Sequence, residues 1–229
     1  MTFDVVIVGA GIVGAACADE FAQAGLRVAV IEAGQIGGGA TAAGMGHITV
    51  MDDSEAQFAL TSYSQQLWRA LVSELPKDTE YEECGAMWVA ADDEEMVEVH
   101  RKKVFYEQRG VPVEVLDAKA LAEAEPNLRD GLAGGLRVLH DGVTYPPCGA
   151  RFFIERSQAR GAQLFTGKPV VELTGKGARL SDGSFIAADF TVNATGSWAP
   201  ELTPGINVQK RKGHLVITDR YPGFVHHQL

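Results

Sequence analysis

Three glycines near the amino terminus have the types and spacing of a phosphate-binding turn. Gly9, Gly11 and Gly14 follow a short apolar run and precede a segment rich in small residues. In such a turn the first glycine permits a tight bend, the second lets the backbone approach a pyrophosphate, and the third lets a helix pack closely on a strand. Glu32, at the end of the next apolar run, can accept hydrogen bonds from both ribose hydroxyls and disfavours a 2′-phosphate. The sequence therefore predicts a dinucleotide site and disfavours NADP.

The elements around these glycines fit that prediction. The β-branched run of residues 5–8 is typical of a strand buried on both faces of a parallel sheet. The small residues of 15–24 predict a helix, and Gly25 is placed to end it. Residues 27–31 predict a second buried strand. Together these segments form a β-α-β unit, with the helix N-terminus available to an anion.

Two further segments indicate whether the dinucleotide is FAD or NAD. The glycine loop, residues 37–46, has side chains too small for a core element and can run its backbone beside a bulky tricyclic ring. The return segment, residues 193–198, follows a late apolar strand and there passes the same dinucleotide again. These two segments favour FAD as the cofactor.

The remaining pattern predicts helices and short strands in alternation. Ser54 and Gln57 form a capping-box pattern at the start of one helix. Helices are predicted from Ser54 to Leu75, from Asp93 to Arg109, after Asp117, and from Pro146 to Gly161. Strands are predicted at residues 87–89, 136–139, 170–173, 178–180, 185–186 and 190–192.

Composition excludes several classes of protein. The chain has 229 residues, of which 46% are hydrophobic, and carries 20 basic against 30 acidic side chains, a net charge of −10. That sign disfavours binding to nucleic acid or to an anionic membrane. Cys17, Cys84 and Cys148 are too widely spaced for a disulfide scaffold or a zinc site. With no signal peptide or long apolar run, the sequence predicts a soluble, cytoplasmic chain without metal ligands.

Taken together, the motifs resemble the D-amino-acid oxidase and glycine oxidase family of FAD-dependent oxidoreductases. The matching segments are residues 5–14, Glu32, residues 39–45 and residues 192–198. Within that family, residues 211–223 look similar to bacterial D-hydroxyproline and opine dehydrogenase subunits.

The resemblance implies a role for each matched residue. The three glycines of the turn would hold the pyrophosphate, Glu32 the adenosine ribose, the glycine loop the flavin, and Val170 the adenine. The implied cofactor-binding residues are Gly9, Gly11, Ile12, Val13, Gly14, Glu32, Ala33, Thr41, Ala42, Gly44, Met45, Val170, Ala194, Thr195, Gly196 and Trp198.

The resemblance also implies a fold and a division into domains. The expected fold is α/β, with a Rossmann-like, three-layer FAD-binding domain formed by residues 1–82 and 141–209. An α+β substrate domain would begin with residues 83–140, and residues 210–229 would add its next strand. Members of the family are longer, so this domain is expected to be incomplete.

The implied reaction is oxidation of the C–N bond of a small amine, amino acid or imino acid by hydride transfer to the flavin. Because the amine must be neutral to release hydride, activity is expected to rise with pH. The alternative is a truncated, non-catalytic FAD-binding fragment or subunit of a homo- or hetero-oligomer. An NAD-dependent dehydrogenase is disfavoured by the glycine loop.

His47 is the candidate catalytic residue within this chain. It directly follows the glycine loop, and histidine is the commonest proton carrier near neutral pH. The alternative interpretation is a polar loop residue without a chemical role.

Overall fold

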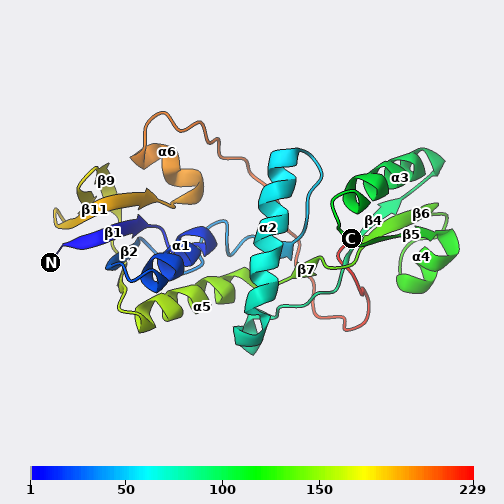
Figure 1. The fold of residues 1–229 in the computed structure, drawn as a ribbon, viewed down its shortest axis with the longest axis horizontal. Helices are drawn as coiled ribbons and strands as arrows, with labels where there is room; N and C mark the ends of the chain where they lie inside the picture. Colours follow the sequence, from blue (N-terminus) through cyan, green and yellow to red (C-terminus); the bar gives the residue numbers. More distant parts are fainter. Residues whose placement is uncertain (1) are drawn as a thin grey trace. The chain divides into compact units, whose positions relative to one another are not determined.

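The computed structural model describes residues 2–229, which divide into two compact units (Figure 1). The first unit combines residues 2–45 with Tyr145–Val216, and the second combines Gly46–Thr144 with Ile217–Leu229. Each unit is therefore built from stretches of chain that are distant in sequence.

The first unit is organised around a six-stranded sheet with strand order β8-β2-β1-β11-β10-β9. Its elements are β1 (Phe3–Val8), α1 (Ile12–Gln23), β2 (Val28–Glu32), α5 (Pro146–Ala159), β8 (Gln163–Thr166), β9 (Val170–Thr174), β10 (Gly177–Leu180), β11 (Phe185–Asn193), a 3-10 turn (Gly196–Trp198) and α6 (Ala199–Leu202). The neighbours β8, β2, β1 and β11 pair in parallel, whereas β9, β10 and β11 form an antiparallel meander.

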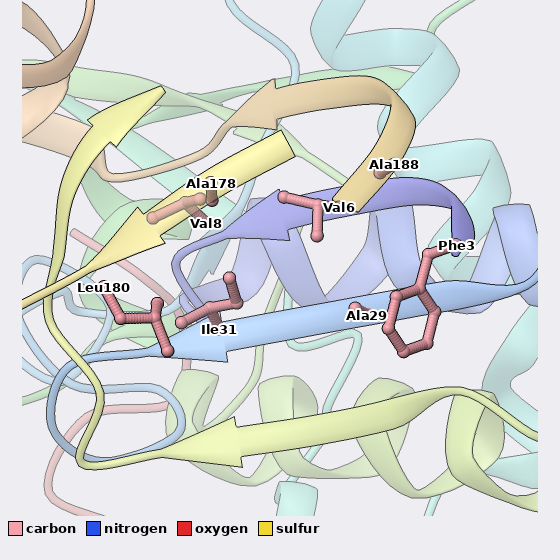
Figure 2. Packing of buried hydrophobic residues seen from close by; sticks show 8 residues of the cluster. All are labelled: Phe3, Val6, Val8, Ala29, Ile31, Ala178, Leu180 and Ala188. Atoms are coloured by element: carbon pink, nitrogen blue, oxygen red, sulfur yellow. The ribbon is translucent and has the colours of Figure 1, made fainter. Parts of the chain in front are cut away.

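Strand β11 belongs to both parts of this sheet. Residues 185–187 pair with β10, and residues 188–193 pair with β1. Figure 2 shows Ala178 and Leu180 of β10 packed with buried side chains of β1 and β2, so the meander covers one face of the parallel strands. Helix α1 contacts β1 and β2 and packs along α5. Helices, parallel strands and meander make three layers, which confirms the predicted Rossmann-like α/β fold.

A buried ion-pair cluster links α1 to the C-terminal end of α5. Asp19 of α1 is only 2% exposed, and its carboxylate lies 2.6 Å from Arg160 and 3.2 Å from Arg156. Pairing with cations stabilises the charged form of a buried carboxylate, whose desolvation would otherwise cost several kcal/mol. The cluster therefore fixes α1, the helix that follows the phosphate-binding turn, against α5 and the residue that follows it.

The second unit is α+β. Its elements are β3 (His47–Ile48), α2 (Glu55–Leu71), two 3-10 turns (Val72–Glu74 and Lys77–Thr79), β4 (Ala86–Ala90), α3 (Asp93–Glu107), β5 (Val113–Asp117), α4 (Ala118–Ala124), β6 (Gly134–Val138) and β7 (Gly142–Val143). The antiparallel sheet β4-β6-β5 contacts α3 and α4, and β3 pairs separately with β7. Its main core gathers around Val99, Leu136 and Val138.

Helix starts follow the predicted side-chain caps. Ser54 accepts a hydrogen bond from the Gln57 N–H at 3.2 Å, and Asp117 accepts one from the Ala120 N–H at 2.8 Å. The capping box at Ser54 is only half formed, because the Gln57 side chain donates to the Met51 sulfur instead. One such cap contributes about 1 kcal/mol to helix stability.

Three predictions of secondary structure were wrong. The strand expected within residues 210–229 is absent: Val216 and Ile217 are 90% and 93% exposed, and only Gln228 forms a bridge, to Ala86. Apolar β-branched residues form a strand only where another strand offers hydrogen bonds, and here the ladder has a single bridge. Residues 185–186 and 190–192 form one strand, not two, and β3, β5, β7 and β8 were missed.

The unit boundaries also differ from the predicted domain boundaries. Residues 46–82 lie in the second unit, because Phe58 of α2 packs on its core and Gln65 of α2 hydrogen-bonds Asp141. Residues 210–216 lie in the first unit, where Lys210 pairs with Glu201 at 2.6 Å. The division into a cofactor domain and a substrate domain remains a prediction.

Within residues 2–229, no helix combines the length and apolarity that crossing a membrane requires. Cys17, Cys84 and Cys148 are all free thiols.

Candidate cofactor and active site

Two of the three turn glycines are required by the packing of the protein itself. Gly9 has φ +103°, and a Cβ on it would lie 2.5 Å from the Ala194 carbonyl oxygen. A Cβ on Gly14 would lie 2.0 Å from the Gly9 carbonyl oxygen. Gly11 differs, because its nearest neighbour is the hydroxyl of Thr41 at 3.1 Å. Only Gly11 leaves an open approach to the turn.

The N-terminus of α1 offers backbone donors at that approach. The Ile12 N–H donates to the Thr41 hydroxyl at 3.1 Å, and the first helical bond runs from the Ala15 N–H to the Gly11 carbonyl at 2.9 Å. The N–H groups of Val13 and Gly14 have no partner within the helix, by the geometry of any α-helix start. Backbone donors at a helix start, together with the helix dipole, fit a pyrophosphate.

Glu32 lies beside this turn at the end of β2. Its Oε2 accepts from the Ala10 N–H at 2.7 Å, and its Oε1 accepts from the Gly34 N–H at 2.7 Å. Each carboxylate oxygen can accept a second hydrogen bond, so these contacts orient the group without saturating it. The Glu32 carbonyl accepts from the Lys168 N–H at 3.1 Å, two residues before Val170 opens β9. This bond brings the start of β9 near the end of β2, and the predicted roles of Glu32 and Val170 remain predictions.

The glycine loop is fastened to the turn and to α5. The Gly37 N–H donates to the Ala10 carbonyl at 2.9 Å, and a Cβ on Gly37 would lie 2.8 Å from Pro147. Thr41 reaches α1, as described, and the loop continues through Ala42 and Gly44 to Met45, whose side chain is 62% exposed. The loop therefore presents mostly backbone.

The return segment comes back to the same place. The Ala194 N–H donates to the Val8 carbonyl at 2.8 Å, which brings this segment to the end of β1. Trp198 lies against Gly39, with its ring 3.3 Å from where a Cβ would stand, and Lys210 lies 4.9 Å above the same ring. The turn, the glycine loop and the return segment are therefore brought together, as the sequence predicts.

Asn193 organises the return segment and was missed as a functional residue. Its side-chain oxygen accepts from the N–H and the hydroxyl of Thr195, at 3.3 and 2.6 Å. Its amide donates to the Ala199 carbonyl and to the Thr203 hydroxyl, at 3.0 and 2.8 Å. An asparagine at a strand end before Ala-Thr-Gly, where local turns form, could have signalled this role.

His47 lies in the second unit, in β3, paired with Val143. Its side chain is exposed and borders a cavity of about 310 Å³. The cavity is also bordered by Asp52, Trp88, Tyr106 and Asp141. The role of His47 remains a prediction, as do the cofactor contacts of the residues of the first unit.

Two carboxyl groups that border this cavity, those of Asp52 and Asp141, differ in the charge of the groups that contact them. Lys102 and Arg101 each lie 2.7 Å from the Asp52 carboxylate. Burial alone would raise the pKa of Asp52, but these two cations hold it below its ordinary value. Asp141 accepts hydrogen bonds only from neutral donors, and burial raises its pKa from 3.8 to about 6.

Comparison with known proteins identifies the family. Residues 4–228 match the family described as FAD dependent oxidoreductase (DAO). Glycine oxidase of Geobacillus kaustophilus is 32% identical over 212 residues, covering 87% of this chain and 56% of that protein. The chain therefore belongs to the DAO/glycine oxidase family of FAD-dependent oxidoreductases, and FAD is confirmed as its cofactor.

Other relatives extend the comparison. Hydrogen cyanide synthase subunit HcnC of Pseudomonas aeruginosa is 27% identical, with 96% of this chain and 65% of that protein covered. The crystal structure of the Geobacillus kaustophilus glycine oxidase aligns with a TM-score of 0.80 at 31% identity, covering 88% of this chain and 57% of that one. L-proline dehydrogenase from P. horikoshii also aligns at 0.80, with 27% identity, over 88% of this chain and 55% of that one. The chain spans little more than half the length of the glycine oxidase and proline dehydrogenase relatives. The narrower resemblance to D-hydroxyproline and opine dehydrogenase subunits remains a prediction.

Proposed function

We propose that this chain carries the FAD-binding part of an oxidoreductase that oxidises the C–N bond of a small amine, amino acid or imino acid. The observation that carries the proposal is the convergence of the turn, the glycine loop and the return segment at the N-terminus of α1. Relatives named glycine oxidase and L-proline dehydrogenase support the substrate class. Bound FAD would accept the hydride, and the protein would bind and orient the FAD.

Different residues of this chain would bind different parts of FAD. The N–H groups of Val13 and Gly14 would bind the pyrophosphate, while Gly11 leaves room for its approach. Glu32 would accept from the ribose hydroxyls, beside Ala33, and Val170 would border the adenine. The residues that would border the flavin are Thr41, Ala42, Gly44, Met45, Ala194, Thr195, Gly196 and Trp198.

A second candidate is a non-catalytic FAD-binding chain that works within a larger assembly. One relative, HcnC, is named as a subunit of hydrogen cyanide synthase, which supports this candidate. In that case a partner chain would complete the substrate site.

The absorption spectrum of the purified chain, reconstituted with FAD, distinguishes these candidates. Glycine, proline and a primary amine would be added without oxygen. Loss of the oxidised flavin bands supports the oxidoreductase, and a bound flavin that stays oxidised supports the second candidate. A protein that binds no FAD under these conditions would contradict both.

A further inference from the structure

Val50 is held at both of its backbone polar groups by buried side chains of the second unit. Its N–H donates to Asp141 Oδ1 at 3.1 Å, and its carbonyl accepts from the Tyr106 hydroxyl at 3.3 Å. Val50 itself is 5% exposed and belongs to the core of this unit. The peptide groups on either side of Val50 are thus fixed by Tyr106 of α3 and by Asp141, which immediately precedes β7.

Asp141 is in turn oriented by α2. Gln65, 8% exposed, donates from its amide nitrogen to the same Oδ1 atom at 2.8 Å. Asp141 is 2% exposed, and its carbonyl accepts from the Gly85 N–H at 2.8 Å. A buried carboxylate with neutral donors alone is costly to keep ionised, so Asp141 depends on its hydrogen bonds to Val50 and Gln65.

The strand that these contacts hold is the one that carries His47. Strand β3 has only two residues, and its pairing with β7 places His47 opposite Val143 and Ile48 opposite Gly142. An isolated two-stranded ladder of this length is marginally stable in water. The hydrogen bond from the Val50 N–H to Asp141 adds a further attachment outside this ladder. Val50 follows β3 in the chain, and Asp141 immediately precedes β7.

We propose that Asp141 is a positioning residue: with Gln65 and Tyr106 it fixes the segment 47–50 and thereby the place of His47. The functional half of this statement rests on the proposed role of His47. The structural half does not depend on it. On this proposal the effect of Asp141 on turnover passes through His47.

A proton-dependent signal can report this contact directly. The ionisable groups that border the same cavity are His47, Asp52, Asp53, Lys102 and Tyr106. His140 adjoins Asp141 in sequence and favours its ionised form. Because the Val50 amide proton points at Asp141, its chemical shift should follow the ionisation of that one carboxyl group.

The first experiment measures the Val50 amide by NMR between pH 4.5 and pH 8, in the full chain and in three variants. The unmodified chain should give a shift with a midpoint near pH 6. Asp141→Asn should abolish the titration yet keep the amide protected from exchange, since the side-chain oxygen remains. Asp141→Ala should lose protection at least tenfold. Asp53→Asn, which alters a carboxyl group bordering the same cavity, should leave both signals unchanged. A Val50 amide that exchanges equally slowly in Asp141→Ala would overturn the proposal.

The second experiment separates this inference from the proposed function. Amine-dependent flavin reduction would be measured for His47→Ala, Asp141→Ala and the double variant, at equal flavin content. Positioning through His47 requires that Asp141→Ala lower the rate and that the double variant be no slower than His47→Ala. If His47→Ala leaves the rate unchanged, the catalytic role of His47 fails, while the Val50 signal still decides whether Asp141 holds the segment. Additive losses would refute action through His47.

Discussion

The hydroxyl of Thr41 accepts a hydrogen bond from the N–H of Ile12, 29 residues earlier, at 3.1 Å. Thr41 thus acts as a cap for α1 from outside the helix, where Gly11 at the N-cap has no side chain to do so. One hydrogen bond both completes the helix start and fastens the glycine loop over it. The phosphate-binding turn and the predicted flavin loop are therefore coupled.

Thr41→Val should weaken FAD binding and lower the free energy of unfolding. The valine keeps the shape of the side chain but cannot accept from Ile12, and loss of a capping acceptor costs about 0.5–2 kcal/mol. Denaturant unfolding and quenching of FAD fluorescence measure the two effects. Thr41→Ser, which retains the hydroxyl, is the control and should stay near the parent values. Equal behaviour of Ser and Val variants would show that the hydrogen bond contributes nothing.

Gly11→Ala and Gly14→Ala should fail in different ways. The new methyl group at Gly11 meets only a side-chain hydroxyl at 3.1 Å, so the chain should fold while FAD affinity falls. The methyl group at Gly14 would meet the Gly9 backbone at 2.0 Å, and such overpacking costs about 1–3 kcal/mol. Urea unfolding of the cofactor-free chains, followed by FAD titration, separates the two. The assignment of Gly11 to the pyrophosphate would be lost if Gly11→Ala bound FAD normally.

Particular residues show how much of the fold could be predicted from the sequence. The β1-α1-β2 unit was predictable because its signals are local: an apolar run, glycines at fixed spacing and an acidic residue at a strand end. The continuity of β11 was not, since Ala187, Ala188 and Asp189 interrupt its apolar pattern. Pairing with β10 on one side and β1 on the other overrides that weak local propensity.

The hydrogen-bonded contacts within the site show the same limit. Asp141 precedes a glycine, which by sequence indicates an ordinary turn. Its partner Gln65 is 76 residues away in the chain, and no local pattern relates the two. Conversely, Leu215, Val216 and Ile217 have strong strand propensity but lie exposed and unpaired as a strand. The local sequence pattern predicted the phosphate-binding turn, whereas contacts between residues distant in the sequence determined the strand pairing and the hydrogen bonds of Asp141.

Glu32→Gln should weaken FAD binding more than FMN binding. The carboxylate accepts from Ala10 and Gly34 on separate oxygens, whereas an amide offers one acceptor and one donor group. One backbone N–H would therefore face an NH₂ group, which lowers the stability of the chain. The amide would also replace the charged acceptor of a ribose hydroxyl, a hydrogen bond worth about 1.5–3 kcal/mol, so FAD affinity should fall roughly ten- to a hundredfold. FMN lacks the adenosine ribose and serves as the control ligand. Equal losses for FAD and FMN in parallel titrations would argue against a ribose contact.

Asp141→Asn should change how the stability of the chain depends on pH. The pKa of Asp141 is raised from 3.8 to about 6 by burial, so the folded state binds this proton more tightly than the unfolded state. Its contribution to stability is therefore complete below about pH 4 and is lost as the pH rises through 6. A difference of about two pKa units corresponds to about 3 kcal/mol.

The free energy of unfolding of the unmodified chain, measured in urea at pH 4.5 and pH 8, should fall more steeply than that of Asp141→Asn. The variant keeps an acceptor for Val50 and Gln65, so at pH 8 it should be at least as stable as the parent. Asp141→Ala removes the acceptor as well and should be less stable than Asp141→Asn at both pH values. Parallel pH profiles for the parent and Asp141→Asn would show that this carboxyl group ionises in the folded chain as it does in water.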